Sequence, residues 1–287
     1  MSMRLYSTTD GIAREDGPGE LAFLELDVLD LGELLRVGSL DEARTARVRK
    51  HLALQECGLM APVPRPGKVP IVGLNYQSHL DEVVGAMGIQ PSDLPTEPNV
   101  HLTAGSAVVG TGAPILLPAF APSAVDYEGE IAVVIGRRAT SVDERHAWSH
   151  VAGFTVANDV SARDIQRRAM SGDLTVSMGL AKSFDTFKPL GPCLVTADEF
   201  GPRLDLAIRT TVNGELRQDA TTGEFLHQIP ELIAFASRLF TLEPGDVLLT
   251  GSPQGVGLFS NRFLAAGDVV EVSVDRIGTL TNSVEAS

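Results

Sequence analysis

The sequence predicts a β-rich α+β fold in which a large domain follows a small N-terminal unit. Short β-branched and apolar runs, typical of strands, outnumber the candidate helices. The two kinds of segment do not alternate regularly, as they would in a parallel βαβ fold. The proline-rich stretch 61–67 favours extended backbone and marks a boundary between the two parts. We therefore expect a small N-terminal domain over residues 1–66 and a catalytic domain over residues 67–287.

The N-terminal unit contains one candidate strand and one candidate helix. Leu21–Leu29 alternates in part between apolar and polar residues, which favours a strand. Ser39 and Glu42 have the spacing of a capping box, and the helix formers of Ala43–Gln55 follow them. This pattern predicts a helix over residues 43–55. Because no catalytic grouping is visible here, we expect a packing or dimerisation role for the unit.

The larger domain shows strands, turns and a few helices in succession. A strand over 69–75 leads into a helix, and the glycines and prolines of 83–100 predict a long loop, either a lid or a disordered excursion. Asn213-Gly214 is a strong turn signal and predicts a hairpin. The other expected strands are 108–117, 126–136, 151–160, 247–250 and 269–274, the last of the chain, and the other expected helices are 143–150, one from 161, and 230–240.

The acidic stretch Asp126–Gly136 is the most informative segment of the domain. Its second half is a buried-strand pattern, and its first half carries Asp126, Glu128 and Glu130 at alternate positions. Alternate side chains of a strand share a face, so the three carboxylates would repel one another unless a cation or water neutralised them. Oxygen ligands favour a hard cation such as Mg²⁺, Mn²⁺ or Ca²⁺. A solvated strand end with surface acids explains the same pattern, and periodicity does not decide between them.

Three further groups are candidates for chemistry. His79 and Glu82 are three residues apart, so on a helix they would share a face and could pair as a carboxylate-oriented general base. Arg163 and Gln166 have the same spacing in a second expected helix. Lys182 lies in an apolar context and would clamp an anionic substrate if a metal were near. Each of these residues can equally be an ordinary solvated surface residue.

Composition excludes several functional classes. The formal net charge of −14 and the absence of basic runs argue against nucleic-acid or anionic-membrane partners. Two cysteines, Cys57 and Cys193, lack metal-ligand spacing and fit a reducing compartment. The glycine-rich loop 251–257 lacks the residues of a P-loop or dinucleotide fingerprint. No apolar stretch is long enough for a membrane span, so we expect a soluble cytoplasmic protein.

Several segments, in the same order, resemble the fumarylacetoacetate hydrolase family over roughly residues 69–283. Each motif alone is modest, and the ordered combination is specific. The matching stretches are Gly73-Leu-Asn-Tyr-Gln-Ser-His79 through Glu82, Asp126-Tyr-Glu-Gly-Glu130, Ala157-Asn-Asp-Val-Ser-Ala-Arg-Asp164, Leu180-Ala-Lys-Ser-Phe184, Pro189-Leu-Gly-Pro192, and Thr241-Leu-Glu-Pro-Gly-Asp246 through Thr250-Gly-Ser-Pro253.

The resemblance implies a rolled mixed β-sheet around a central divalent metal, in a homodimer of the shorter bacterial type. The family's metal carboxylates match Glu128, Glu130 and Asp159, which leaves Asp126 as a supporting residue. Its catalytic pair on a mobile lid matches His79 and Glu82, assisted by Lys182. Its substrate contacts match Arg163, Gln166 and the loop at Thr250 and Gly251.

Two departures from the family pattern stand out. An additional metal-binding aspartate of the long members would fall near Val72, so that ligand is missing. Many short members carry a Lys-Pro pair before the acidic stretch, where this chain reads His101-Leu-Thr-Ala-Gly-Ser106. Substrate assignments that depend on that lysine therefore do not transfer.

The leading functional hypothesis is a metal-dependent hydrolase that cleaves a C–C bond in acylpyruvate-like or other β-diketo acids. A 2-oxo acid would chelate Mg²⁺ or Mn²⁺, and His79, oriented by Glu82, would activate water. The alternatives are an isomerase of 2-hydroxyhepta-2,4-diene-1,7-dioate-type diacids or an oxaloacetate decarboxylase. A sugar-acid dehydratase or hydrolase also remains open. A metal-binding scaffold without catalysis is the remaining alternative.

Overall fold

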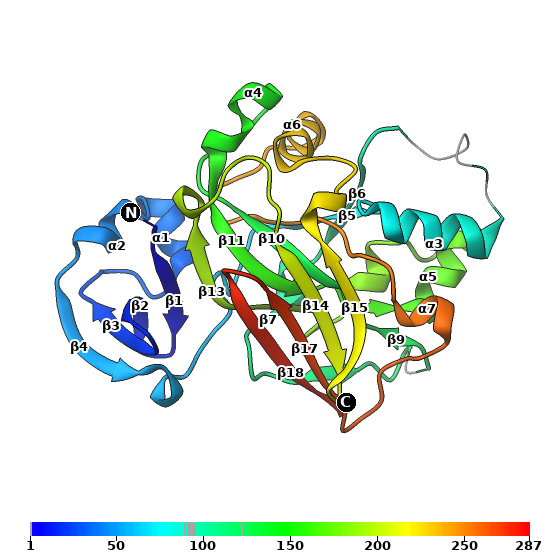
Figure 1. Cartoon of the computed structure of the whole chain (residues 1–287), viewed down its shortest axis with the longest axis horizontal. Helices are drawn as coiled ribbons and strands as arrows, with labels where there is room; N and C mark the ends of the chain where they lie inside the picture. The colour runs from blue at the N-terminus through cyan, green and yellow to red at the C-terminus, as the bar shows by residue number, and fades with distance from the viewer. Residues whose placement is uncertain (1, 89, 91–95, 122) are drawn as a thin grey trace.

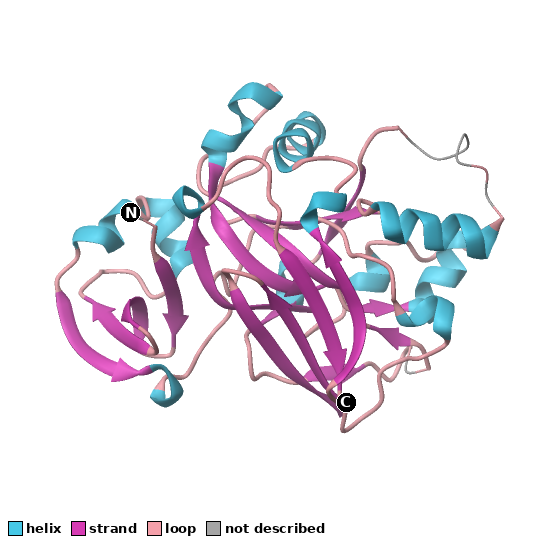
Figure 2. Ribbon diagram, in the orientation of Figure 1, coloured by secondary structure: helices cyan, strands magenta, loops and turns pink. Residues whose placement is uncertain are grey.

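Two packed β-sheets dominate the computed structural model, and most helices lie at the periphery (Figures 1 and 2). The structure describes all residues except 1, 89, 91–95 and 122. Parallel and antiparallel strand pairs occur together, so the predicted β-rich α+β class is confirmed. In the part of the chain that is described, no helix is both long and apolar enough to cross a membrane.

The larger sheet runs through the centre of the molecule. Strand β7 (Val108–Val109) is attached to one of its members, β13, in parallel. From one edge to the other the order is β4 (Val48–Ala53), β3 (Glu20–Leu24), β2 (Gly11–Gly17), β1 (Arg4–Thr8), β13 (Lys188–Thr196), β11 (Val151–Asn158), β10 (Gly129–Ile135), β16 (Val247–Leu249), β5 (Val69–Gly73) and β6 (Asn99–Thr103).

A second sheet packs against the first and contains both strands of the predicted hairpin. Its order is β15 (Glu215–Thr221), β14 (Ala207–Val212), β17 (Val269–Val274), β18 (Gly278–Ala286) and β8 (Ile115–Leu117), and β9 (Val125–Asp126) pairs separately with β12 (Ser161–Ala162).

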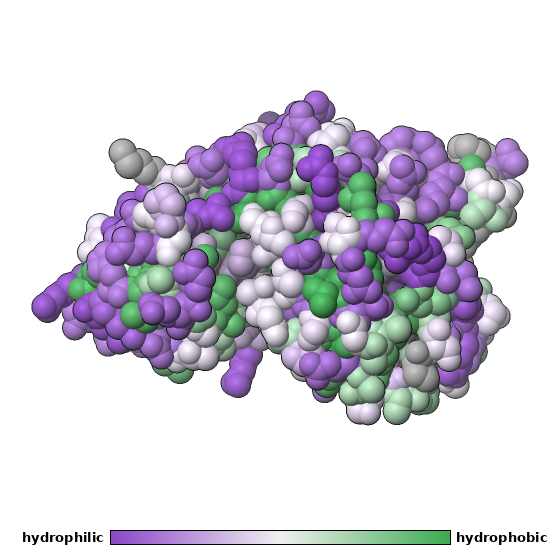
Figure 3. Space-filling view, turned by 60° about the horizontal axis from the view of Figure 1, so that its bottom comes forward, coloured by the Kyte–Doolittle hydropathy of each residue, from purple (hydrophilic) through white to green (hydrophobic). Residues whose placement is uncertain are grey.

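Helices α3, α5 and α7 gather at one end of the molecule, at the right in Figure 1. Hydrophilic residues cover much of the surface in Figure 3, as the acidic composition leads one to expect, with apolar patches toward the lower right. The helices are α1 (Leu31–Val37), α2 (Asp41–Thr45), α3 (Gln77–Met87), α4 (Glu144–Ala147), α5 (Arg163–Met170), α6 (Ile229–Leu239) and α7 (Gly257–Ser260).

Strand β10 is fully buried because it lies between β11 and β16 and is covered on both faces. Its β-branched residues suit that position. Gly129 sits where a Cβ atom would collide with the Thr210 hydroxyl of the second sheet. A glycine between two acidic residues therefore lets the two sheets approach closely beside the acidic stretch.

The N-terminal unit differs from the prediction. The expected helix over 43–55 is wrong: α2 ends at Thr45, and Val48–Ala53 forms β4. Pairing of β4 with β3 satisfies the backbone of both, and such tertiary pairing overrides helix propensity. The Glu42 carboxylate does accept a hydrogen bond from Ser39 N (3.2 Å), one half of the capping box. Strand β18 was not anticipated, so the expected last strand is followed by another.

The loop expected over 83–100 is shorter in the structure, because α3 continues to Met87 and β6 begins at Asn99. Part of that stretch, 89 and 91–95, lies outside the described residues, so its role as a lid stays a prediction. The division at residues 66 and 67 also stays a prediction. Strand β1 nevertheless pairs with β13 at Arg4↔Val195 and Leu5↔Leu194, so the N-terminal strands extend the central sheet.

Candidate metal centre and active site

Three buried carboxylates converge at one end of the central sheet. Glu128 and Glu130 come from the start of β10, and Asp159 follows β11, the neighbouring strand. The Asp159 amide donates a hydrogen bond to the Glu128 carbonyl (2.8 Å), which draws the two chain segments together. One carboxylate oxygen of each residue lies within 4.8 Å of the others. We refer to Glu128, Glu130 and Asp159 as the acidic triad.

Glu130 is the carboxylate of the triad with the weakest neutralisation. Within the described residues its side chain accepts one hydrogen bond, from Gly251 N (2.7 Å). Burial raises the pKa of Glu130 well above its usual value, and the charges of Asp159 and Glu128 raise it further. A buried carboxylate with two anionic neighbours and one neutral donor is the electrostatic environment that a cation would relieve.

Two lysines neutralise the other side of the triad. Lys182 Nζ lies 2.7 Å from Glu128 Oε2 and 2.5 Å from Asp159 Oδ2. Burial alone would lower the pKa of Lys182, but Asp159 and Glu128 outweigh it and raise the pKa. Lys188 on β13 is fully buried, with Nζ 2.7 Å from Asp159 Oδ1, and burial lowers its pKa. Sequence reasoning missed Lys188, although a lysine within a buried apolar strand is an unusual signal.

Arg163 connects the triad to Asp126. Its guanidinium pairs with Asp126 Oδ2 (2.8 Å) and Glu128 Oε1 (2.5 Å) and donates to Gln166 Oε1 (2.5 Å). Burial would lower the pKa of Arg163, and the two carboxylates raise it instead. Asp126 also accepts hydrogen bonds from the amides of Gly257 and Leu258, so it anchors the start of α7 and lies outside the triad.

The donor set fits a hard divalent cation. Four buried carboxylates, the triad and Asp126, face three buried cationic side chains, Lys182, Lys188 and Arg163. The acids exceed the cations by one, and Glu130 is the acid that no cationic side chain contacts in the described structure. Oxygen ligands of this kind suit Mg²⁺ or Mn²⁺. The triad is therefore a buried acidic site that could hold a metal ion.

His79 of the predicted histidine–glutamate pair lines the same cavity as Glu128 of the triad, whereas Glu82, Glu130 and Asp159 are not among the described residues that line it. His79 Nδ1 is 2.9 Å from Glu82 Oε2, both on α3. The other Glu82 oxygen accepts a hydrogen bond from Gly255 N (3.1 Å), and the His79 ring lies 6.2 Å from that of Phe259 on α7. The cavity has a volume of about 250 Å³. Of the predicted residues, His79, Glu128, Arg163, Gln166 and Lys182 line it.

Thr250 is not among the described residues that line this cavity. Its side chain is fully buried, and its hydroxyl donates to the Ile131 carbonyl (2.8 Å). The backbone amide of Gly251, unlike the Thr250 hydroxyl, bonds to a residue of the triad, because it donates a hydrogen bond to Glu130. The φ of Gly251 is +97°, a backbone conformation that favours glycine. Ser252, the next residue, lines the cavity in place of Thr250 and was not anticipated.

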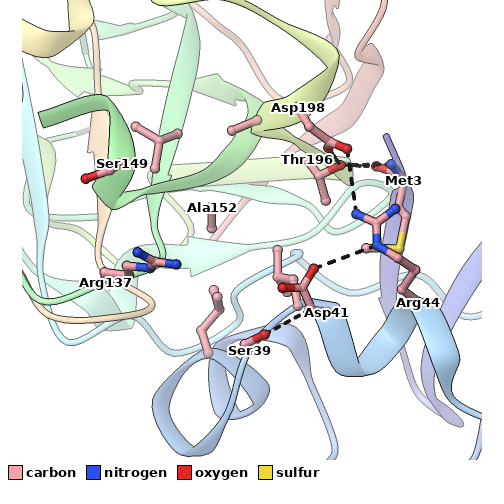
Figure 4. Close-up of a pocket in the computed structure, with 14 residues that line it drawn as sticks. Met3, Ser39, Asp41, Arg44, Arg137, Ser149, Ala152, Thr196 and Asp198 are labelled. Atoms are coloured by element: carbon pink, nitrogen blue, oxygen red, sulfur yellow. Dashed lines mark hydrogen bonds and ion pairs between the residues drawn. The ribbon is translucent and has the colours of Figure 1, made fainter. Parts of the chain in front are cut away.

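A second cavity, of about 270 Å³, lies between the N-terminal unit and the ends of β11 and β13 (Figure 4). Three of its ionic side chains are paired: Arg44 Nε lies 3.7 Å from Asp41 Oδ1, and Arg44 Nη2 lies 3.6 Å from Asp198 Oδ2. No residue of the triad or of the His79–Glu82 pair lines it among the residues that the structure describes. We therefore place the candidate active site at the first cavity.

Comparison with known proteins defines the class to which this fold and site belong. The family model of the fumarylacetoacetate (FAA) hydrolase C-terminal domain matches residues 68–285. The chain belongs to the fumarylacetoacetate hydrolase family, which is a family of enzymes.

Individual relatives are similar along most of the chain. An oxaloacetate tautomerase of Xenopus laevis is 36% identical, over 99% of this chain and 91% of its own length. The oxaloacetate tautomerase YisK of Bacillus subtilis is 39% identical, over 81% of this chain and 74% of its own. A solved structure of 2-hydroxyhepta-2,4-diene-1,7-dioate isomerase from Mycobacterium marinum is 32% identical with a TM-score of 0.77, covering 100% of this chain and 99% of that chain.

Proposed function

We propose that this protein is a divalent-metal-dependent tautomerase that interconverts the enol and keto forms of a small 2-oxo diacid such as oxaloacetate. The observation that carries the proposal is the acidic triad, whose Glu128 lines the same cavity as His79, the partner of Glu82. The similarity to two oxaloacetate tautomerases and to a dienedioate isomerase supports it, because these reactions move a proton without adding water. This reverses the order of the sequence-based hypotheses, in which hydrolysis came first.

Glu128, Glu130 and Asp159 would hold Mg²⁺ or Mn²⁺ in this proposal. When bound, the cation supplies Lewis-acid chemistry, which polarises a carbonyl oxygen and favours the build-up of negative charge there. Lys182, in contact with Glu128 and Asp159, adds a fixed positive charge at the same end of the cavity.

We also propose that the protein works as a homodimer.

His79 would move the proton. Since Glu82 accepts a hydrogen bond, we assign the ring proton to Nδ1, which leaves Nε2 as a base. Nε2 removes a proton from C3 of the keto acid, and the C–H electron pair forms the C2=C3 double bond while the carbonyl pair moves to the C2 oxygen. The imidazolium then returns the proton to that oxygen, which completes the enol. Glu82 stabilises the positive ring during the transfer.

The remaining predicted residues have supporting roles in the proposal. Arg163 and Gln166 line the cavity and would orient the anionic head of the substrate. Gly251 supports Glu130 through its amide. Thr250 would contribute through its backbone position, since its hydroxyl is bonded to Ile131.

The test is the decay of freshly dissolved enol-oxaloacetate, followed by ultraviolet absorbance and by proton NMR, with and without Mg²⁺ or Mn²⁺. We expect metal-dependent acceleration that His79→Ala largely removes. If the metal-loaded protein leaves the rate at that of buffer, the tautomerase proposal is wrong.

Hydrolysis of acylpyruvates remains the second candidate because the His79–Glu82 pair can also activate water. In that reaction His79 takes a proton from water, hydroxide adds to the distal carbonyl, and the C–C electron pair moves to C3, which is then protonated. Product identification separates the candidates: a carboxylic acid plus pyruvate indicates hydrolysis, and carbon dioxide plus pyruvate from oxaloacetate indicates decarboxylation. Unchanged carbon skeletons indicate tautomerisation.

A further inference from the structure

Strand β6 presents two polar side chains to the candidate active-site cavity. Asn99 and His101 lie two residues apart, so they share one face of the strand, and both line the cavity. Val100, between them, packs on the opposite side against the core that contains Val72. Gly73 lies opposite Asn99 in the register, and a Cβ there would come within 3.2 Å of Asn99 Nδ2. The glycine therefore leaves room for the amide.

Both side chains are free to bind a ligand. Neither has a hydrogen-bond partner among the residues that the structure describes. Burial lowers the pKa of His101, and the charge of Lys182 lowers it further, whereas the charge of Asp159 acts in the opposite direction. Arg163 and Lys182 differ in this respect, because their charges are already paired with carboxylates.

The rest of the cavity wall narrows the choice of ligand. Met170, Leu258 and Phe259 form an apolar side, which offers no hydrogen bonds to a charged group. Asn99 and His101 line the same cavity as Glu128 and Lys182. With the 2-oxo acid head of a short substrate at Glu128 and Lys182, its other end would meet this polar part of the wall.

We propose that Asn99 and His101 form a subsite that hydrogen-bonds the distal carboxylate of a 2-oxo diacid and thereby determines substrate specificity. The inference rests on the proposed function for the position of the acid head. An amide N–H and an imidazole N–H are two donors that match two carboxylate oxygens. A substrate with a methyl group in that position would leave both donors unpaired, which is the kind of mismatch that enzymes discriminate against strongly.

Two ligands that differ at the distal end test the subsite by calorimetry with Mn²⁺-loaded protein. Oxalate carries only the head group, whereas (S)-malate carries a comparable head and a distal carboxylate. We expect His101→Leu and Asn99→Ala each to weaken malate binding about tenfold, since each removes a hydrogen bond to a charged group. Oxalate binding should stay within about twofold. Leu102→Ala, at a half-exposed position on the same strand, is the control and should change neither.

Other outcomes overturn the subsite. Equal weakening of both ligands indicates a general packing defect. Unchanged malate binding in both variants shows that the distal carboxylate binds elsewhere, and no malate binding to the wild type shows that the cavity does not accept a distal carboxylate. A failure of the proposed function looks different. In that case the wild type does not accelerate the decay of enol-oxaloacetate, while malate binding still depends on His101 and Asn99.

Discussion

The acidic triad and the His79–Glu82 pair each contribute one residue, Glu128 and His79, to the wall of one cavity, but they are built differently. The triad belongs to the central sheet, where β10 is fully buried and two lysines contact the carboxylates. The histidine pair sits on α3 near the surface, with side chains 11% and 19% exposed. Within the described residues its side chains make two hydrogen bonds, the mutual one and the link to Gly255. One region is fixed by the core, whereas the other depends on a few contacts. A mutation in one of the two regions should therefore impair one process, metal binding or proton transfer, and leave the other in place.

The largest effect is expected from Glu130→Gln. This change removes a charged ligand that no cationic side chain contacts in the described structure, so the affinity for Mn²⁺ should fall more than about 100-fold and activity should be lost. Calorimetry or electron paramagnetic resonance measures the affinity. Glu243→Gln, at an exposed surface pair with Arg138, is the control. Retained Mn²⁺ affinity would contradict the assignment of Glu130 as a ligand.

The second-largest effect is expected from a substitution in the His79–Glu82 pair. His79→Ala should lower kcat on the enol–keto reaction about 10²- to 10⁴-fold, the usual contribution of a general base. The Mn²⁺ affinity should stay within about threefold, because within the described residues no hydrogen bond or ion pair joins His79 to the triad. His146→Ala on exposed α4 is the matched control. A parallel loss of metal and activity would show that the two regions are not separable.

Asp126→Asn should weaken metal binding less than a substitution in the triad does. It keeps the size of the side chain but weakens the pair with Arg163, which in turn contacts Glu128. Residues that support a ligand in this way change metal affinity by about 10- to 100-fold, so we expect a loss near tenfold. The measurement is the same Mn²⁺ titration. A loss as large as that of Glu130→Gln would overturn the ranking of Asp126 behind the triad.

Glu82→Gln should give the smallest of these effects. The amide can still accept a hydrogen bond, but it no longer stabilises an imidazolium, so we expect a kcat about tenfold lower with unchanged metal affinity. Asp81→Asn, the exposed neighbour that bonds to Gln77, controls for a general change in α3. If Glu82→Gln has the wild-type kcat, the carboxylate does not assist His79.

The sequence predicted the fold class, and it predicted two local arrangements of candidate site residues, because local patterns carry that information. Alternation placed Glu128 and Glu130 together, and the spacing of His79 and Glu82 gave their pairing on a helix. Periodicity alone also grouped Asp126 with the ligands, whereas the fold turns it toward Arg163 and the start of α7.

Long-range contacts explain what the sequence did not predict. Strand β4 forms because β3 is available to pair with it, which residues 43–55 do not encode locally. Lys188 contacts Asp159 because the fold places β13 beside the segment that carries Asp159, and this neighbourhood is not encoded locally. Asn99 and His101 line the cavity because β6 pairs with β5. The local sequence of residues 99–101 does not contain this information.

Glu82 joins two parts of the active site with its two oxygens, one on His79 and one on the amide of Gly255. Separation of α3 from the loop 251–257 would break the second bond, whereas the first bond lies within α3 and would move with the helix. Glu82 therefore links the helix that carries His79 to the loop whose Gly251 amide holds Glu130.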